Sequence, residues 1–355
     1  QPPSSYGYEG LGAPCLAKNG TCLANSAMRD TLLAGAQATM NFREKLATRG
    51  IMCLDGALAS ELEARGCDLN QRLWSAAILH QNPELISAVH RDYLVAGADC
   101  IASSSYQASL PGFAEAGFDA REGEGLYRLS IRLAFEARDD FCRAKGVRVD
   151  SPEAPLVAVS IGPYGAYLAD GSEYRGNYGI SDTELRSFHA ERLELAIDEL
   201  GQLTDRPLLA FETIPCLGEA KILTELLNQH PEAQAWLAFS CNSTETVSEG
   251  QSITSCVAAL QDSPGLVALG VNCTDPALMP ELIPLLAQGN LPVISYPNSG
   301  ASYDSELKLW CGPEEELPLD SDLDAWSQAG ASILGGCCRT TPAWIAQLVA
   351  WREAR

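Results

Sequence analysis

The stretch Ser332-Ile333-Leu334-Gly335-Gly336-Cys337-Cys338-Arg339 joins a short apolar run to two glycines and a pair of adjacent cysteines. We interpret the run as a strand, and the two thiols at its end as candidate ligands of a soft metal. Adjacent side chains on a regular strand point to opposite faces, so both thiols can hold one ion only if the chain bends. The two glycines would permit that bend. Two buried structural cysteines or a vicinal disulfide are alternatives that this stretch alone leaves open.

Seven further apolar runs precede this one, and segments with helical patterns separate them. The predicted strands cover residues 51–54, 99–103, 156–161, 207–211, 235–240, 266–271, 292–296 and 332–334. Helix starts between them carry recognisable signals, such as the capping box Ser181-Asp182-Thr183-Glu184 and the N-cap Asn82 before a proline. Continuous apolar runs, in place of alternating ones, are typical of parallel strands that are covered on both faces.

This alternation predicts a single-domain (β/α)8 barrel of the TIM type over residues 40–355. A doubly wound open sheet is the alternative, and the absence of Gly-x-Gly-x-x-Gly after the first strand weakens it. Residues 1–39 are rich in glycine, alanine, proline and serine and show no period, so we expect a poorly ordered N-terminal extension there. Met40 is then a candidate for the true start of the chain.

Composition narrows the class of function. The formal net charge is −22, which disfavours binding to nucleic acid and favours a cationic small substrate. No apolar run approaches the roughly 20 residues of a membrane span, and the N-terminus shows no secretory signal. The 13 cysteines lack the spacing of a disulfide framework, so we predict a cytoplasmic protein.

In a (β/α)8 barrel the active site lies at the C-terminal ends of the strands. Polar residues that directly follow a predicted strand are therefore the candidates for the site. Strand ends would deliver Asp55, Glu212, Cys273 and the Cys337–Cys338 pair to one mouth. Three soft ligands with an open fourth position are the pattern of catalytic zinc. Cys241 also ends a strand and is a rival third ligand.

The two carboxylates have simpler explanations as well. Asp55 could be a helix N-cap, and Glu212 could pair with an arginine of the barrel. The four histidines fall in predicted helices or at their ends, so a histidine-ligated zinc or a Ser-His-Asp triad is disfavoured. We expect His90 and His189 to be surface or packing residues.

The chain resembles the homocysteine S-methyltransferase family, in the branch that uses S-methylmethionine or S-adenosylmethionine as methyl donor. The matching motifs are spread over nearly all of residues 50–345. They are Asp55-Gly56-Ala57-Leu58-Ala59-Ser60-Glu61-Leu62, Ser105-Tyr106-Gln107-Ala108-Ser109, Ser160-Ile161-Gly162-Pro163-Tyr164-Gly165-Ala166, Phe211-Glu212-Thr213-Ile214-Pro215, Gly270-Val271-Asn272-Cys273, Tyr296-Pro297-Asn298-Ser299-Gly300 and Gly335-Gly336-Cys337-Cys338-Arg339. The combination of Gly-x-Asn-Cys with Gly-Gly-Cys-Cys is the most specific of these signals.

The resemblance implies a zinc-dependent (β/α)8 barrel and a set of site residues. Cys273, Cys337 and Cys338 would hold one Zn²⁺, with the substrate sulfur as fourth ligand, which decides against Cys241. Asp55 and Glu212 would hold the amino group of homocysteine. Asn272 and Tyr106 complete the predicted substrate site. The family usually has glycine where this chain has Ala57, and the added methyl group could crowd the substrate carboxylate.

The implied reaction moves a methyl group from a sulfonium to the homocysteine thiol and forms methionine. Tyr106, Tyr164 and Tyr167 could hold the sulfonium by cation–π contact, although each could equally pack under the loops. Betaine as donor or selenocysteine as acceptor are variants of the same chemistry. A zinc-binding thiol redox sensor without methyltransferase activity is the alternative from another class.

Overall fold

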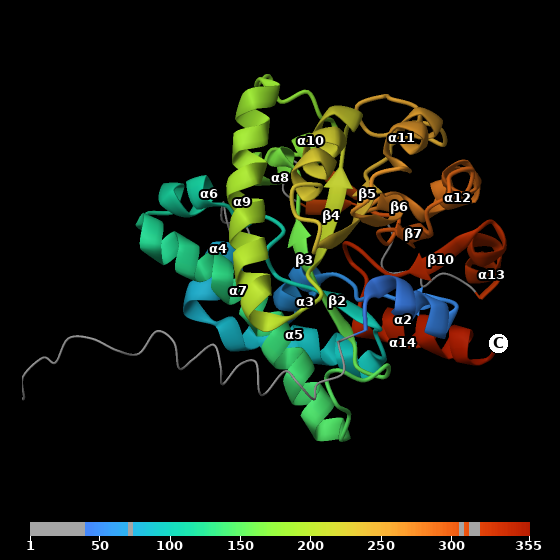
Figure 1. The fold of residues 1–355 in the computed structure, drawn as a ribbon, viewed down its shortest axis with the longest axis horizontal. Coiled ribbons are helices and arrows are strands. Elements are labelled where there is room, and N and C mark those ends of the chain that lie inside the picture. The colour runs from blue at the N-terminus through green and yellow to red at the C-terminus, as the bar shows by residue number, and fades with distance from the viewer. Residues whose placement is uncertain (1–39, 70–73, 305–308, 312–319) are drawn as a thin grey trace, which may run out of the picture. The chain divides into compact units, whose positions relative to one another are not determined.

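The computed structural model describes residues 40–69, 74–304, 309–311 and 320–355 (Figure 1). The extension predicted for residues 1–39 lies outside the described residues. Eight strands form one sheet in the order β1-β10-β7-β6-β5-β4-β3-β2, and each neighbouring pair in this order is parallel. The strands are β1 Met52–Cys53, β2 Cys100–Ala102, β3 Leu156–Ile161, β4 Leu208–Ile214, β5 Gln234–Phe239, β6 Leu266–Asn272, β7 Val293–Tyr296 and β10 Ala331–Leu334.

The first and last strands of that order also meet. Leu54 forms a parallel bridge with Cys100, and the Asp99 N–H donates to the Cys53 carbonyl at 2.7 Å. The sheet therefore closes on itself, and the predicted (β/α)8 barrel is confirmed.

Helices follow the strands and surround the sheet (Figure 1). They are α2 Phe42–Arg49, α3 Leu58–Ala64, α4 Trp74–Gln81, α5 Pro83–Ala96, α6 Leu110–Glu115, α7 Ala120–Lys145, α8 Tyr164–Leu168, α9 Asp182–Leu203, α10 Leu217–Leu227, α11 Ile253–Leu260, α12 Met279–Leu286, α13 Asp320–Gln328 and α14 Pro342–Glu353, with the 3-10 turns η1 Ser172–Tyr174 and η2 Pro276–Leu278. The predicted capping box at Ser181 is present at the start of α9. An antiparallel hairpin, β8 Ser302–Asp304 with β9 Leu309–Cys311, interrupts the alternation and was not predicted from the pattern.

Both faces of the barrel strands are apolar, as the continuous runs indicate. In β5, Trp236 and Ala238 belong to a core cluster inside the barrel, whereas Ala235, Leu237 and Phe239 pack in the cluster beneath the outer helices. Residues of opposite parity thus serve two separate cores, which is how a parallel barrel buries its strands. No helix in the described ranges is long and apolar enough to cross a lipid bilayer.

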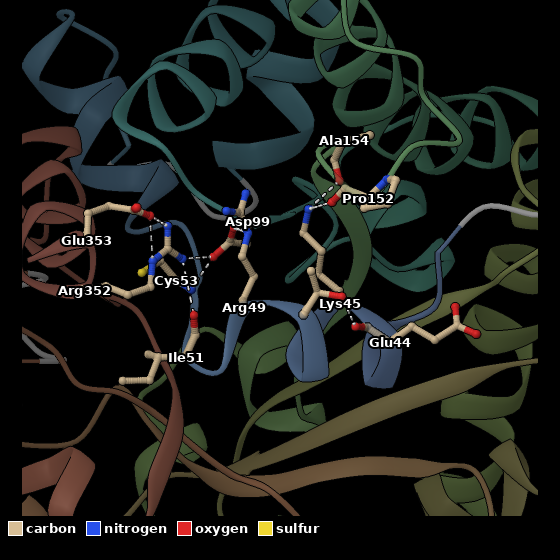
Figure 2. Close-up of polar contacts among 11 residues, drawn as sticks. Glu44, Lys45, Arg49, Ile51, Cys53, Asp99, Pro152, Ala154, Arg352 and Glu353 are labelled. Carbon is tan, nitrogen blue, oxygen red and sulfur yellow. Dashed lines mark hydrogen bonds and ion pairs between the residues drawn. The ribbon is translucent and has the colours of Figure 1, made fainter. Parts of the chain in front are cut away.

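Helix α2 covers the N-terminal end of the barrel. Phe42 packs against Trp236 with ring centroids 5.8 Å apart, and the Arg43 guanidinium donates to the Leu266 carbonyl at 2.7 Å. Lys45 is fully buried, and its ammonium donates to the carbonyls of Pro152 and Ala154 (Figure 2). Burial lowers the pKa of Lys45 to about 8.

A buried carboxylate joins the same end of the barrel to the two helices nearest to it. Asp99 pairs with Arg49 of α2 at 2.8 Å and with Arg352 of α14, and it accepts the Cys53 N–H at 2.9 Å (Figure 2). Because this end is closed by α2 and its ion pairs, the site lies at the opposite, C-terminal end of the strands.

Candidate active site and metal centre

A cavity of about 250 Å³ lies at the C-terminal ends of the strands. Its wall contains the three predicted cysteines, the predicted carboxylates and Tyr106, together with groups that the sequence did not single out. They include Glu173, Tyr174 and Trp236. Among the described residues that line the cavity there is no lysine or arginine. The wall is therefore suited to a cationic ligand.

The three cysteines predicted as metal ligands lie together. The Sγ atoms of Cys273, Cys337 and Cys338 are all within 4.8 Å of one another, and those of Cys273 and Cys338 are 3.3 Å apart. Cys273 directly follows β6, and the pair follows β10 by two residues. Cys241, the rival ligand, instead belongs to the core cluster under the outer helices.

The backbone brings the thiols together in a way that the sequence did not indicate. Gly335 and Gly336 do not adopt positive φ, so the bend does not use a left-handed glycine conformation. Instead Cys273 has φ of 48° and Arg339 has φ of 64°. The glycines are needed for space, because a Cβ at Gly336 would lie 2.1 Å from the Thr340 hydroxyl oxygen.

That hydroxyl group is part of the turn that shapes the cysteine pair. Thr340 donates from Oγ1 to the Cys337 carbonyl at 2.7 Å, and the Cys337 N–H donates to the Pro297 carbonyl at 2.9 Å. A Cβ at Gly335 would also lie 2.6 Å from that of Leu54. Close packing of β10 on β1 and of the turn on itself therefore fixes the position of both thiols.

The electrostatics of the cluster fit a divalent cation. Hydrogen bonds from Cys337 and Cys338 hold the pKa of Cys273 well below its ordinary value. The same bonds to Cys273, with burial, raise the pKa of Cys337 and of Cys338. One thiolate is thus favoured, and two more beside it in a buried site require a positive charge among them.

The donor set fits zinc in particular. Three thiolates are soft ligands, and among the described histidine, cysteine and acidic residues no fourth member joins the cluster. A zinc ion held by three protein ligands keeps a position for a substrate sulfur. The hydroxyl group of Tyr174 also lies 3.0 Å from the Cys273 sulfur.

Asn272 is fully engaged within the protein. Its Oδ1 accepts the Thr213 N–H at 2.6 Å, and its Nδ2 donates to Thr213 Oγ1 at 2.8 Å and to the Cys337 sulfur at 3.7 Å. The side chain therefore joins the end of β4 to one of the cysteines. These contacts favour a positioning role, and direct substrate binding by Asn272 stays a prediction.

The two predicted carboxylates line the cavity, Asp55 from two residues after β1 and Glu212 from within β4. Asp55 Oδ2 accepts the Ala102 N–H at 2.8 Å, and Glu212 accepts a hydrogen bond from the Ser160 hydroxyl group. Burial raises the pKa of Glu212 to about 7, and burial together with the nearby Glu212 charge raises the pKa of Asp55 well above its ordinary value.

The simpler explanations for these carboxylates do not hold. Asp55 is not the N-cap of α3, because Ala57 occupies that position. Glu212 lies inside β4, which runs to Ile214 and so further than predicted, and no arginine in the described part of the chain pairs with it. Two partly buried acids in an acidic wall match the ammonium group of an amino acid.

The predicted aromatic residues divide into two groups. Tyr106 lines the cavity, and its carbonyl accepts from the buried Arg192 at 3.0 Å. Tyr164 and Tyr167 do not line it; they pack on each other and on Phe188 with centroids 4.9 to 5.4 Å apart. For these two the packing alternative is correct.

The two histidines expected to be surface or packing residues are both buried. His90 lies in the cavity wall, and burial lowers its pKa to about 4. His189 contacts the buried Glu219 at 2.7 Å beneath the loop that follows β3. That loop carries Glu173 and Tyr174, whose only signal in the sequence is their place after a strand.

The comparisons with known proteins agree with the geometry. The family model described as homocysteine S-methyltransferase matches residues 52–351. Homocysteine S-methyltransferase YbgG of Bacillus subtilis is 46% identical over 310 residues, which cover 87% of this chain and 96% of the relative. A selenocysteine Se-methyltransferase of Brassica oleracea is 42% identical and covers 84% and 88% of the two chains.

A solved structure extends the likeness to three dimensions. The homocysteine methyltransferase MmuM of Escherichia coli, in its metallated form, superposes with a TM-score of 0.74 at 43% identity, over 87% of this chain and 98% of the other. The fold and site define a (β/α)8 enzyme with a three-cysteine metal centre. This chain belongs to the homocysteine S-methyltransferase family.

Proposed function

We propose that this protein transfers a methyl group from a sulfonium donor, S-methylmethionine or S-adenosylmethionine, to the thiol of L-homocysteine. The observation that carries this proposal is the placement of three cysteine thiols and two partly buried carboxylates, Asp55 and Glu212, on one cavity. The thiols suit a metal that binds sulfur, and the carboxylates suit the ammonium group of the same substrate. An amino acid with a side-chain thiol satisfies both requirements.

The protein's residues would bind and orient the two substrates. Cys273, Cys337 and Cys338 would hold zinc, which supplies a Lewis acid that keeps a bound thiol deprotonated near neutral pH. Asp55 and Glu212 would receive the ammonium group, and Tyr106 would contact the donor. Holding both sulfur atoms in line is the main contribution to rate that this wall can make.

The transfer balances without an acid or a base in the chemical step. The carbon–sulfur bond of the sulfonium breaks, and its electron pair stays on the donor sulfur. The thiolate of homocysteine forms the new carbon–sulfur bond, so both products are neutral thioethers. The thiol proton has already left for solvent, and His90, which burial keeps neutral, has no acidic proton to give.

One variant of this function and one alternative to it have specific support. A selenocysteine acceptor is favoured by the likeness to a protein named selenocysteine Se-methyltransferase. A redox role is favoured by the 3.3 Å separation of the Cys273 and Cys338 sulfur atoms. The redox role leaves Asp55 and Glu212 without a purpose, so we place it second. Betaine would be a third candidate donor.

Zinc analysis and parallel activity assays test the proposal. We expect one zinc per chain and methionine production with S-methylmethionine or S-adenosylmethionine, and not with betaine. Cys273→Ala and Cys337→Ala should lose both zinc and activity, whereas Cys241→Ala should keep both. Protein that stays inactive after zinc is supplied, or a Cys337→Ala variant with full activity, would refute it.

The cellular location, the extent of the functional unit and the kind of partner are also proposals. We infer a reducing cytoplasm as the location, supported by ten free cysteines among the described residues. We infer that residues 40–355 are one functional unit and that its partners are small molecules, with no nucleic acid among them. A truncated chain that begins at Met40 and retains activity would support that boundary.

A further inference from the structure

One carboxylate in the cavity wall has no role in the function proposed above. Glu173 lies in η1, on the loop that follows β3, and it lines the cavity. Its Oε2 atom is buried and has no hydrogen-bond partner among the described residues. Asp55 and Glu212, by contrast, each accept hydrogen bonds from the protein. A buried carboxylate oxygen without a partner costs stability, so a ligand that meets it is the simplest reason for its presence.

The backbone of Glu173 is held firmly in place. Its carbonyl accepts the Ser240 hydroxyl group at 2.8 Å. A Cβ at Gly165 would lie 2.4 Å from the Glu173 nitrogen, so α8 packs directly against this segment. The backbone position from which the carboxylate reaches the cavity is therefore fixed by the fold.

The same segment lies against the metal centre. The next residue, Tyr174, has its hydroxyl group 3.0 Å from the Cys273 sulfur. Glu173 therefore belongs to the part of the wall next to the cysteines. In a direct transfer the sulfonium must lie beside the homocysteine sulfur, and so near the same cysteines.

Charge decides what Glu173 would bind. No lysine or arginine appears among the described lining residues, so this acid has no protein cation in the cavity. Asp55 and Glu212 suffice for the ammonium group of homocysteine, which leaves the second substrate. We propose that Glu173 is the counter-ion of the methyl donor's sulfonium group; this inference rests on the function proposed above.

The role has a definite kinetic signature. The positive charge on the donor sulfur disappears as the methyl group leaves, so Glu173 attracts the bound donor more strongly than the transition state. Interactions that favour the ground state lower KM without raising kcat. Loss of the charge should therefore raise the KM of the donor and leave kcat unchanged or slightly higher.

The test compares zinc-loaded wild type with Glu173→Gln, which keeps the shape and removes the charge. Glu281→Gln, on the exposed side of α12, is the matched control. Calorimetry measures binding of S-methylmethionine and of methionine, which lacks the sulfonium. Glu173→Gln should weaken S-methylmethionine binding and raise its KM about 10- to 100-fold, the range for a charged contact. Methionine binding, homocysteine KM and kcat should change less than about twofold.

Further measurements separate this role from a structural one. Glu173→Gln should melt at or above the wild-type temperature, because it removes an unpaired buried charge. Glu173→Asp keeps the charge and should bind S-methylmethionine more tightly than Glu173→Gln. An equal loss of homocysteine and donor binding with a lower melting temperature would overturn the proposal.

The outcomes also separate this inference from the proposed function. Wild type that transfers methyl groups while Glu173→Gln keeps the donor KM would refute the Glu173 assignment alone. Wild type that binds S-methylmethionine through Glu173 but produces no methionine would refute the proposed function alone.

Discussion

Asn272→Ala tests whether the side-chain amide of Asn272 joins the end of β4 to the cysteine pair. The substitution removes the acceptor of the Thr213 N–H and the donor to Thr213 Oγ1 and to the Cys337 sulfur. A buried N–H left without a partner costs about 1–3 kcal/mol, and each net hydrogen bond contributes about 1 kcal/mol. We therefore expect the free energy of unfolding to fall by about 2–4 kcal/mol.

The same substitution should weaken the metal site. Groups that contact a metal ligand typically change metal affinity by about 10- to 100-fold when they are removed. Urea unfolding of metal-free protein measures the first effect, and competition with a chelator measures the second. Asn272→Asp retains an oxygen for the Thr213 N–H but brings a negative charge toward the Cys337 sulfur. It should therefore lose more zinc affinity than stability.

Asn290→Ala is the control, because that asparagine is exposed and its side-chain amide donates to the exposed Asp262 at 3.3 Å. It should change the free energy of unfolding by less than about 0.5 kcal/mol and leave zinc binding unaltered. If Asn272→Ala were as mild as this control in both measurements, the positioning role of Asn272 would be refuted.

Three other perturbations have defined outcomes. Gly336→Val should weaken zinc binding before it unfolds the protein, since the added carbon meets the turn of the cysteine pair; chelator competition and thermal melting compare the two. The homocysteine KM should fall as pH rises through about 7, where Glu212 ionises, and Glu212→Gln should remove that dependence. Between pH 8 and 10.5 wild type should gain up to about 3 kcal/mol of stability over Lys45→Met, because only the unfolded lysine stays protonated there; urea unfolding tests this.

The barrel and its three thiols could be predicted because their signals are local. Apolar runs mark the strands, and a polar residue after such a run falls at the C-terminal edge whatever the rest of the chain does. The choice between Cys273 and Cys241 could not be made this way, since both follow strands. The structure separates them by the face on which each side chain lies, and a shift of one residue at a strand end reverses that face.

The parts of the site that sequence reasoning missed depend on partners far apart in the chain. The bonds between Thr213 and Asn272 span 59 positions, and the contact of Tyr174 with Cys273 spans 99. Glu173 was missed because two features of the fold single it out. Its loop lies against the cysteines, and its Oε2 atom has no hydrogen-bond partner among the described residues. The local sequence pattern shows neither where a loop runs in space nor which distant residues it contacts.

The unusual backbone conformations at the cysteine cluster belong to residues other than Gly335 and Gly336. Of the described residues other than glycine, five have positive φ, and three of these lie at the cysteine cluster. Cys273 belongs to the cluster, Arg339 directly follows Cys338, and Thr213 is bonded to Asn272. Each such conformation costs of order 1–3 kcal/mol and persists only where neighbours over-determine it. The neighbours are visible: Asn272 holds the Thr213 N–H, the Tyr296 carbonyl accepts from the Cys273 N–H at 3.2 Å, and the Arg339 N–H donates to Ser60 at 3.0 Å.

Because these bonds are made by protein groups alone, the strain is paid for by folding and not by the metal. The thiols should then already stand together in the metal-free protein, with zinc binding to a site that is largely formed. This arrangement leaves the fourth position to the substrate, since no further histidine, cysteine or acidic residue in the described part of the chain joins the cluster. The unusual conformation of Cys273 thus connects the packing of the barrel to the proposed chemistry: the same constraint that gathers three sulfur atoms keeps room for a fourth.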